Sequence, residues 1–495
     1  MATAVAEAQE QLIEVEETAP ALEAAHRPAG EQKTFRAYDP DQVLLMAPVL
    51  SEWVPEGDLA HFVSDLVETS LDLGPIYASY ESERGCPPYD PRLMLKLLIY
   101  GYATATPSSR KLERATFRDV AVRMLCADQH PDFRSIARFR RRHLDALSEL
   151  FCQALRLCAK AGLVKLGTLA LDGTKLRANA SRHKAMSHER MVKQEAELEA
   201  EIAAIRAQAA ALLKDAEHAD EAEDERHGPD RRGDELPQEL ARRASRLARI
   251  REARAALEAE EAERERARHA RAAAEGRTLR KPHPDEKPPT PKPTAQRNFT
   301  DPESKIMKTA DGAFHQCFNG QAVVDETAQV IVAADACAEA PDARRLEPAL
   351  DQLEENLTAI AAELPAGAKL LADAGYFSEA NVEATAAHGL DPHIATGRLK
   401  HSERVAPAPR GRIPKDATPK QRMARKLRTK RGRAAYARRK TTVEPVFGQM
   451  DTVQSARRLL LRGEAAARAQ WRFNCAVHNL LKLHRAGGLG LITAT

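Results

Sequence analysis

The sequence predicts an α/β protein in which a mixed sheet follows a helical N-terminal region and is interrupted by an inserted helical hairpin. Leucine-rich helical patterns fill residues 36–162. Short apolar segments typical of buried strands come before and after residues 183–295. The intervening residues are rich in Glu, Ala and Arg and end in a proline-rich tract, which a helix cannot cross.

The composition is that of a helix-rich protein with solvated, charged segments. Hydrophobic residues make up 43% of the 495 residues, aromatic residues 4% and charged residues 30%. No window approaches the roughly 18 uninterrupted apolar residues of a membrane span, so we expect no membrane contact. Residues 1–35 begin as an acidic stretch without a secretory signal, and we interpret them as a disordered leader. Seven scattered cysteines without a Cys-x-x-Cys pair favour reduced thiols in a cytoplasmic protein.

The N-terminal region, residues 36–162, has the features of a helical DNA-binding domain. Pro91 begins one helix, a second runs from Arg110 to Leu125, and Ser135 is the expected N-cap of a third that continues to Gly162. The third helix resembles a recognition helix for a major groove. Alternatively, some of its arginines pair within the protein, because they point around the helix. They are Arg134, Arg138, Arg140, Arg141 and Arg142.

The second half of the chain has the strand and helix order of a mixed sheet. The expected strands, each short and apolar, are residues 166–172, 320–325, 330–334, 369–373 and 393–396. Helical patterns follow the third and the fourth strand. This order matches a ribonuclease-H-like domain formed by residues 163–182 and 296–485, followed by a tail at 486–495.

Several acids of this domain are candidates for metal chemistry. Two-metal phosphodiester cleavage needs clustered carboxylates, because Mg²⁺ prefers hard oxygen ligands. Asp172 and Asp373 end the first and fourth strands, which are adjacent in this topology, and Glu444 falls in the first turn of the C-terminal helix. Asp325 and Asp335 also follow apolar strands, and a strand-end Asp is more often a turn or capping residue. Spacing alone does not choose among them.

The residues between 397 and 440 form a strongly basic segment. They include seventeen Lys and Arg residues against two acids, a net charge of +15. Such density is typical of contact with a polyphosphate partner, although a solvated loop without a partner is the alternative. We expect Arg428, Lys430 and Arg431 to grip phosphates without reading bases.

Apolar residues at helical spacing predict an antiparallel helical hairpin within residues 183–295. The first run contains Leu198, Ile202, Ile205, Ala209 and Leu212. After a break at Gly228-Pro229, the second run contains Leu240, Ala244, Leu247, Ile250 and Leu257. Dimerisation, DNA contact and a solvated spacer remain open as roles for this insertion.

Three segments, residues 171–179, 371–376 and 443–448, resemble the catalytic blocks of bacterial insertion-sequence DDE transposases. The closest group is the insertion-sequence four/five superfamily branch with an InsH-like N-terminal domain. Further blocks at 89–102 and 132–143 extend the likeness over residues 36–485. The resemblance implies that the ribonuclease-H-like domain is catalytic. It also implies that two Mg²⁺ ions, or Mn²⁺ in their place, are held by Asp172, Asp373 and Glu444.

The same resemblance implies the partners of the protein. We expect it to bind double-stranded DNA, both the terminal inverted repeats of an element and target DNA, with Lys175 among the contacts. Paired DNA ends imply a homodimer, acting on the nucleoid in a bacterial cytoplasm. A catalytically inactive DNA-binding repressor and a ribonuclease-H-like DNA nuclease without strand transfer are the alternatives.

The surroundings of Glu444 depart from the family pattern, in which a tyrosine, an arginine and a lysine flank the last acid. Tyr436 and either Arg439 or Lys440 match the first two, although Arg439 is one residue farther from Glu444 than usual. We expect Tyr436, Arg439 and Lys440 to contact DNA. Asp451 stands where the lysine is expected. Three later arginines are possible substitutes for it: Arg457, Arg458 and Arg462.

Overall fold

The computed structural model describes residues 49–80, 87–181, 184–204, 207, 238–397, 408 and 411–493. The leader expected at residues 1–35 lies outside these ranges. Among the described helices, none combines the length and the apolar character needed to cross a membrane.

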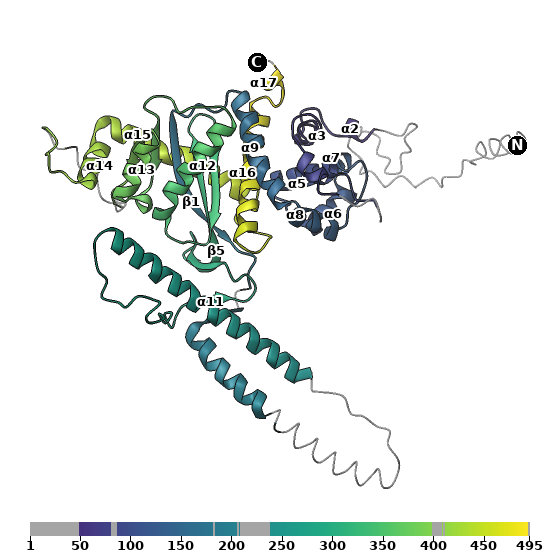
Figure 1. Ribbon diagram of the computed structural model, residues 1–495. Coiled ribbons are helices and arrows are strands. Elements are labelled where there is room, and N and C mark those ends of the chain that lie inside the picture. Colours follow the sequence, from purple (N-terminus) through teal and green to yellow (C-terminus); the bar gives the residue numbers. More distant parts are fainter. Residues whose placement is uncertain are drawn as a thin grey trace, which may run out of the picture. The chain divides into compact units, whose positions relative to one another are not determined.

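The N-terminal region is helical, as the sequence predicts (Figure 1). Its helices are α2 (Leu50–Trp53), α3 (Leu59–Thr69), α4 (Gly74–Tyr77), α5 (Pro91–Ala103), α6 (Ser109–Arg118), α7 (Val120–Leu125), α8 (Phe133–Arg142) and α9 (Leu144–Lys160). The longest, α9, packs along α16 (Glu464–Ala486). Buried residues of these helices belong to the same hydrophobic core as the sheet.

Two helices expected to be continuous are each broken. The helix expected from Arg110 to Leu125 ends at Arg118, because Asp119 takes an extended conformation and its carboxylate caps α7. The next expected helix breaks at His143, which separates α8 from α9. The N-cap of α8 is Asp132 rather than Ser135, since Asp132 accepts hydrogen bonds from the N–H groups of Arg134 and Ser135.

The described strands form a six-stranded mixed sheet and a separate two-stranded ribbon. The sheet order is β4-β5-β1-β7-β8, with β6 also paired to β5. The strands β1, β7 and β8 are parallel, whereas β5 is antiparallel to β1, β4 and β6. This is the ribonuclease-H-like arrangement that the sequence predicts. The bounds are β1 (Thr168–Arg177), β4 (Lys305–Lys308), β5 (Phe314–Asp325), β6 (Ile331–Cys337), β7 (Lys369–Ala372) and β8 (Asp391–Ile394).

The first strand continues past the acid expected to end it. Asp172 lies in the middle of β1, because β5 pairs with β1 as far as Arg177. The parallel partner β7 pairs only with residues 168–171. Asp172 is therefore the position at which β1 loses its parallel neighbour but keeps its antiparallel one.

Helices and short helical turns complete this domain. They are η2 (Asp342–Arg345), α12 (Leu346–Ala359), η3 (Ala374–Tyr376), α13 (Glu379–Ala387), α14 (Pro419–Arg428), α15 (Lys430–Thr452), α16 and α17 (Gly490–Thr493). Glu444 was expected in the first turn of a helix. It lies instead in the second half of α15, which begins at Lys430 because Thr429 caps it, and Pro445 is inside the helix.

The insertion is an antiparallel helical hairpin on a small β-ribbon (Figure 1). The ribbon pairs β2 (Ala185–Ser187) with β3 (Gln296–Asn298). Residues 188–204 are helical and pack against α11 (Gln238–Ala274). Ion pairs Arg243–Glu201, Arg251–Glu195 and His188–Glu258 show the opposite directions of the two helices. The apolar seam consists of Met191, Leu198, Ile202, Leu247, Ile250, Ala253 and Leu257.

Parts of the predicted seam do not belong to it or are not described. Ala244 is exposed. Ile205, Ala209 and Leu212 lie outside the described residues, as does the side chain of Leu240.

Candidate active site

The sheet places Asp172 and Asp373 side by side. Leu171 of β1 pairs with Ala372 of β7, the last pair of this parallel ladder, and each aspartate follows its strand residue directly. The Asp172 carboxylate accepts the N–H of Gly173 at 2.9 Å. The Asp373 carboxylate caps η3 by accepting the N–H of Gly375 at 2.8 Å. The predicted convergence of these two acids is therefore observed.

The electrostatics of Asp172 follow from its burial and from its charged neighbours. Burial raises the pKa of the Asp172 carboxyl above its usual value. The Arg439 guanidinium and the Gly173 N–H oppose that increase, whereas the Asp373 carboxylate adds to it. Arg439 Nη1 lies 2.7 Å from Asp172 Oδ2. Burial lowers the pKa of Arg439, but Asp172, Tyr436 and Asp373 together more than offset this, so the pKa is raised and the guanidinium stays charged.

Glu444 does not lie beside the two aspartates. It follows Arg439 by five residues, which in an α-helix corresponds to a rotation of about 140°. Arg439 and the buried Val443 face the sheet, whereas Glu444 is exposed. The extra residue in the spacing between Arg439 and Glu444 is the physical reason, since one residue fewer would rotate the acid by about 100° towards the pair.

The donor atoms present suit a hard divalent cation at the aspartate pair. Both carboxylates offer oxygen ligands, and one of them, that of Asp172, already pairs with the Arg439 guanidinium. Across the described ranges, however, no three or more Asp, Glu, His and Cys side chains are grouped closely enough to hold a metal ion. Within these ranges the two aspartates therefore form a pair without a third such side chain beside them.

The competing acids are used by the fold. Asp325 is fully buried and accepts the N–H groups of Lys165, Leu166 and Thr327, so it closes the turn beside β1. Asp335 forms an ion pair with Arg468 at 2.7 Å. These contacts give both acids the capping or pairing role that a strand-end Asp commonly has.

The predicted DNA contacts near the acids differ in their surroundings. Burial raises the pKa of Tyr436, against an opposing effect of Arg439, and the Asp373 carboxylate raises it further, so Tyr436 lies close to the pair. Lys440 is exposed. Lys175 is not a free cation, because its ammonium lies 3.3 Å from Asp342 Oδ1 and donates to the Ala340 carbonyl.

A polar network beneath the aspartates was missed by the sequence reasoning. Asp342 Oδ1 accepts hydrogen bonds from Asn319 at 2.8 Å and from Gln321 at 3.2 Å, in addition to Lys175. The buried hydroxyl of Tyr376 donates to Gln321. The available signal was the alternation of Asn319 and Gln321, two polar side chains on the same face of an apolar strand.

The five arginines of α8 separate into two groups. Arg140 is buried, donates to the Pro107 carbonyl at 2.7 Å and lies over the Tyr102 ring. Arg142 donates to the Ser79 carbonyl and lies 4.5 Å from the Tyr80 ring centroid. The other three share one exposed face of the helix and have no ion-pair partner within the described ranges: Arg134, Arg138 and Arg141.

The neighbouring helix α6 adds cations that the sequence reasoning did not assign. The Arg110 guanidinium lies 4.9 Å from the ring centroid of Phe133 at the start of α8, which joins the two helices into one basic surface. No ion pair involves the exposed cations of α6 among the residues that the structure describes. They are Arg110, Lys111, Arg114 and Arg118.

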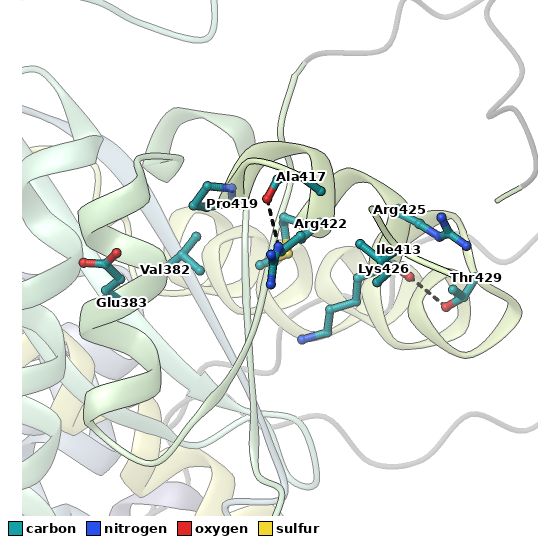
Figure 2. Close-up of a pocket in the computed structure, with 10 residues that line it drawn as sticks. Val382, Glu383, Ile413, Ala417, Pro419, Arg422, Arg425, Lys426 and Thr429 are labelled. Carbon is teal, nitrogen blue, oxygen red and sulfur yellow. Dashed lines mark hydrogen bonds between the residues drawn. The ribbon is translucent and has the colours of Figure 1, made fainter. Parts of the chain in front are cut away.

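The basic segment is likewise divided between structural and exposed cations. A pocket of about 680 Å³ lies between α13 and α14. Figure 2 shows its lining residues, with Arg422 turned towards the Ala417 carbonyl. Arg425 donates to the Gly411 and Arg412 carbonyls, and Lys426 pairs with Asp391. The three residues expected to grip phosphates are exposed instead: Arg428, Lys430 and Arg431.

The possible substitutes for the missing lysine also differ in their contacts. Arg457 pairs with Asp451 at 3.0 Å, and Arg462 donates to the Asn179 carbonyl at 3.0 Å. Arg458 is exposed, and no ion pair is found for it in the described part of the chain. Of the three, Arg457 is neutralised by an acid, whereas Arg458 and Arg462 have no ion pair within the described residues.

Family models recognise both halves of this architecture. Residues 48–142 match a transposase domain (DUF772), and residues 273–480 match a transposase DDE domain. The chain belongs to the DDE transposases. The second match contains Asp373 and Glu444, whereas Asp172 precedes the insertion and lies outside it. No curated protein and no solved structure matches the chain.

Proposed function

We propose that this transposase cleaves DNA at the ends of a mobile element and joins the freed 3′-hydroxyl ends to target DNA. The observation that carries the proposal is the pair formed by Asp172 and Asp373 at the point where β1 and β7 part, with Arg439 beside it. Asp373 lies within the segment that matches the transposase DDE domain, and the strand residues before Asp172 pair with that segment through β7.

Asp172 and Asp373 would hold divalent metal, Mg²⁺ or Mn²⁺ and two ions in the full assembly. When bound, these ions activate the attacking oxygen and stabilise charge on the leaving oxygen of the phosphodiester. The protein supplies the fixed spacing of the carboxylates. Arg439 supplies a positive charge that balances part of the charge of the pair, and a guanidinium is also a strong donor to phosphate.

Glu444 is proposed as the third acid, completed on the DNA complex. Glu444 is exposed on α15, and the same helix carries the exposed cations Lys430, Arg431 and Lys440. DNA that contacts these cations would approach α15 from its exposed side, where Glu444 also lies. A rotation or local rewinding at Pro445, which interrupts the helical hydrogen bonding, would turn the carboxylate towards the pair.

Two basic surfaces would bind the DNA. The first consists of α6 and α8 and carries Arg110, Lys111, Arg114, Arg118, Arg134, Arg138 and Arg141, which suits the inverted repeats. The second consists of Arg428, Lys430 and Arg431 and suits phosphate contacts without base reading. A homodimer follows from the need to treat two ends together. The described apolar seam of the inserted hairpin is filled by its own two helices.

A strand-transfer assay tests the proposal. Pre-cut DNA carrying the sequences that flank the gene, tested for terminal inverted repeats, is incubated with a target plasmid, Mg²⁺ and the full chain. We expect joined products from the wild type. We expect none from Asp172→Ala, whose binding to the same DNA in a gel-shift assay should be unchanged, because the carboxylate is not a phosphate contact.

Each other outcome rejects the proposal in a different way. Hydrolysed ends without joined products would identify a nuclease, and specific binding without any strand breakage would identify a repressor. Joined products from Asp172→Ala would show that the reaction uses another site.

A further inference from the structure

The structure contains a buried polar network that connects the loops of the two aspartates. Gln321 on β5 pairs with Gly173, the residue after Asp172. Tyr376, three residues after Asp373, donates its hydroxyl to Gln321. Both side chains are almost completely buried, with exposures of 2% and 0%. Unsatisfied polar groups at such depth are costly, so the network has a defined arrangement.

Asp342 is the charged member of this network. Its Oδ1 atom accepts hydrogen bonds from Lys175, Asn319 and Gln321. Gln321 also donates to Asn319 at 3.0 Å. The carboxylate therefore fixes the orientation of both amides, and the Gln321 oxygen is left to receive the Tyr376 hydroxyl.

The Asp342 carboxylate approaches both aspartate loops beside a glycine, and at Gly173 the side chains of Gln321 and Asp342 leave no room for a Cβ. A Cβ on Gly173 would lie 3.2 Å from Asp342 Oδ1 and 2.5 Å from Gln321 Nε2. A Cβ on Gly375 would lie 3.6 Å from Asp342 Oδ2. One carboxylate oxygen thus faces the backbone beside Asp172, and the other faces the backbone beside Asp373.

A second link holds the Asp342 segment against the same loop. The Asn381 amide at the start of α13 donates to the Tyr376 carbonyl at 2.6 Å and to the Ala343 carbonyl at 2.7 Å. The η2 turn, which begins with Asp342, is therefore tied to the Asp373 loop from both sides. A shift of Asp342 would move this loop relative to β1.

We propose that Asp342 is a positioning residue that sets the separation of Asp172 and Asp373 through Gln321 and Tyr376. The inference rests on the proposed function, since it assigns the pair as metal ligands. The network acts in the way that outer partners of metal ligands act, by orienting carboxylates that would otherwise turn away from each other. Lys175 then balances the Asp342 charge rather than contacting DNA.

Manganese binding to the full chain without DNA tests this role. Mn²⁺ affinity is measured from the electron paramagnetic resonance signal of the free ion, and folding is followed by thermal melting. We expect Asp342→Asn to weaken Mn²⁺ binding by about tenfold or more while the protein stays folded. Asp351→Asn is the matched control, because Asp351 is exposed on α12 and pairs with His388.

Tyr376→Phe provides an independent test, since it removes only the hydroxyl that joins the Asp373 loop to Gln321. It should weaken Mn²⁺ binding in the same direction. The double variant should bind no more weakly than Asp342→Asn alone, because both changes break one chain of hydrogen bonds. If Asp342→Asn does not fold, the Tyr376→Phe result decides.

The outcomes separate this inference from the proposed function. If Asp373→Asn abolishes Mn²⁺ binding but folded Asp342→Asn and Tyr376→Phe bind within twofold of the wild type, the positioning role is wrong and the metal pair stands. If the wild type does not bind Mn²⁺, or Asp373→Asn binds as well as the wild type, the metal pair itself is wrong, and the positioning role with it.

Discussion

The sheet edge and helix α15 hold their acids in different ways. Asp172 and Asp373 are placed by strand pairing and by backbone hydrogen bonds, with a buried network beneath them. Glu444 is placed only by the rotational phase of a helix, and that phase leaves it exposed. A strand pair brings two acids together whenever the register is correct, whereas a helix needs the correct residue count as well. The first arrangement is therefore preformed, and we expect the second to be completed by DNA.

The largest expected effect is that of Glu444→Gln, which should reduce DNA cleavage but not Mn²⁺ binding. Because Glu444 faces solvent in the DNA-free protein, this variant should bind Mn²⁺ within twofold of the wild type. Its cleavage of end-containing DNA should fall by at least about 100-fold, because the last acidic ligand is then missing. Parallel Mn²⁺ titrations and cleavage assays measure both quantities.

Either half of that result can fail. Loss of Mn²⁺ binding by DNA-free Glu444→Gln would show that the acid already belongs to the preformed site. Undiminished cleavage would remove Glu444 from the catalytic set.

Substitutions of arginines on helix α8 should have effects of intermediate size. Their effects should differ in kind, because some of these arginines are buried and others are exposed. Arg138→Ala should weaken DNA binding and lower the salt dependence, the slope of log affinity against log salt concentration, by about one. Arg140→Met should leave that slope unchanged. It should lower the free energy of unfolding by about 1–3 kcal/mol, because the half-buried Pro107 carbonyl loses its donor.

Binding at several salt concentrations and chemical denaturation measure these two effects. An equal change of slope in both variants would contradict the division of α8 into a DNA face and a core face.

The smallest effect should come from Arg439→Met. Metal binding requires the Asp172 carboxylate to be deprotonated. Burial already raises its pKa, and Arg439 opposes that increase. Without the guanidinium the pKa rises further, so the midpoint at which Mn²⁺ binding is lost on acidification should move to higher pH. Mn²⁺ affinity measured as a function of pH tests this sign, and an unchanged midpoint or a shift to lower pH would contradict it.

The sequence predicts the elements that depend on local patterns. Apolar strands, helical seams and the strand order lead to the ribonuclease-H-like sheet and to the convergence of Asp172 and Asp373. Helix breaks at Asp119 and His143 escape this reasoning, because the apolar pattern continues through them while the backbone does not.

The part of the site that the sequence does not predict depends on contacts between distant segments. Asp342 lies 170 residues after Asp172 and ends no strand, so nothing local marks it. The division of α8 between Arg138 and Arg140 depends on which face meets α5 and the loop before α6. Sequence reasoning finds the arginines, but it does not show which of them lie on the buried face of α8 and which on the exposed face.

The central claim is that Asp172 and Asp373 form a preformed metal-binding pair. The most direct measurement is Mn²⁺ binding to the DNA-free full chain in Asp172→Asn and Asp373→Asn. Asp335→Asn is the control, since Asp335 also lies on a strand of the sheet but pairs with Arg468. We expect each of the first two variants to lose binding and the control to keep it. Binding retained by folded Asp172→Asn and Asp373→Asn would contradict the account.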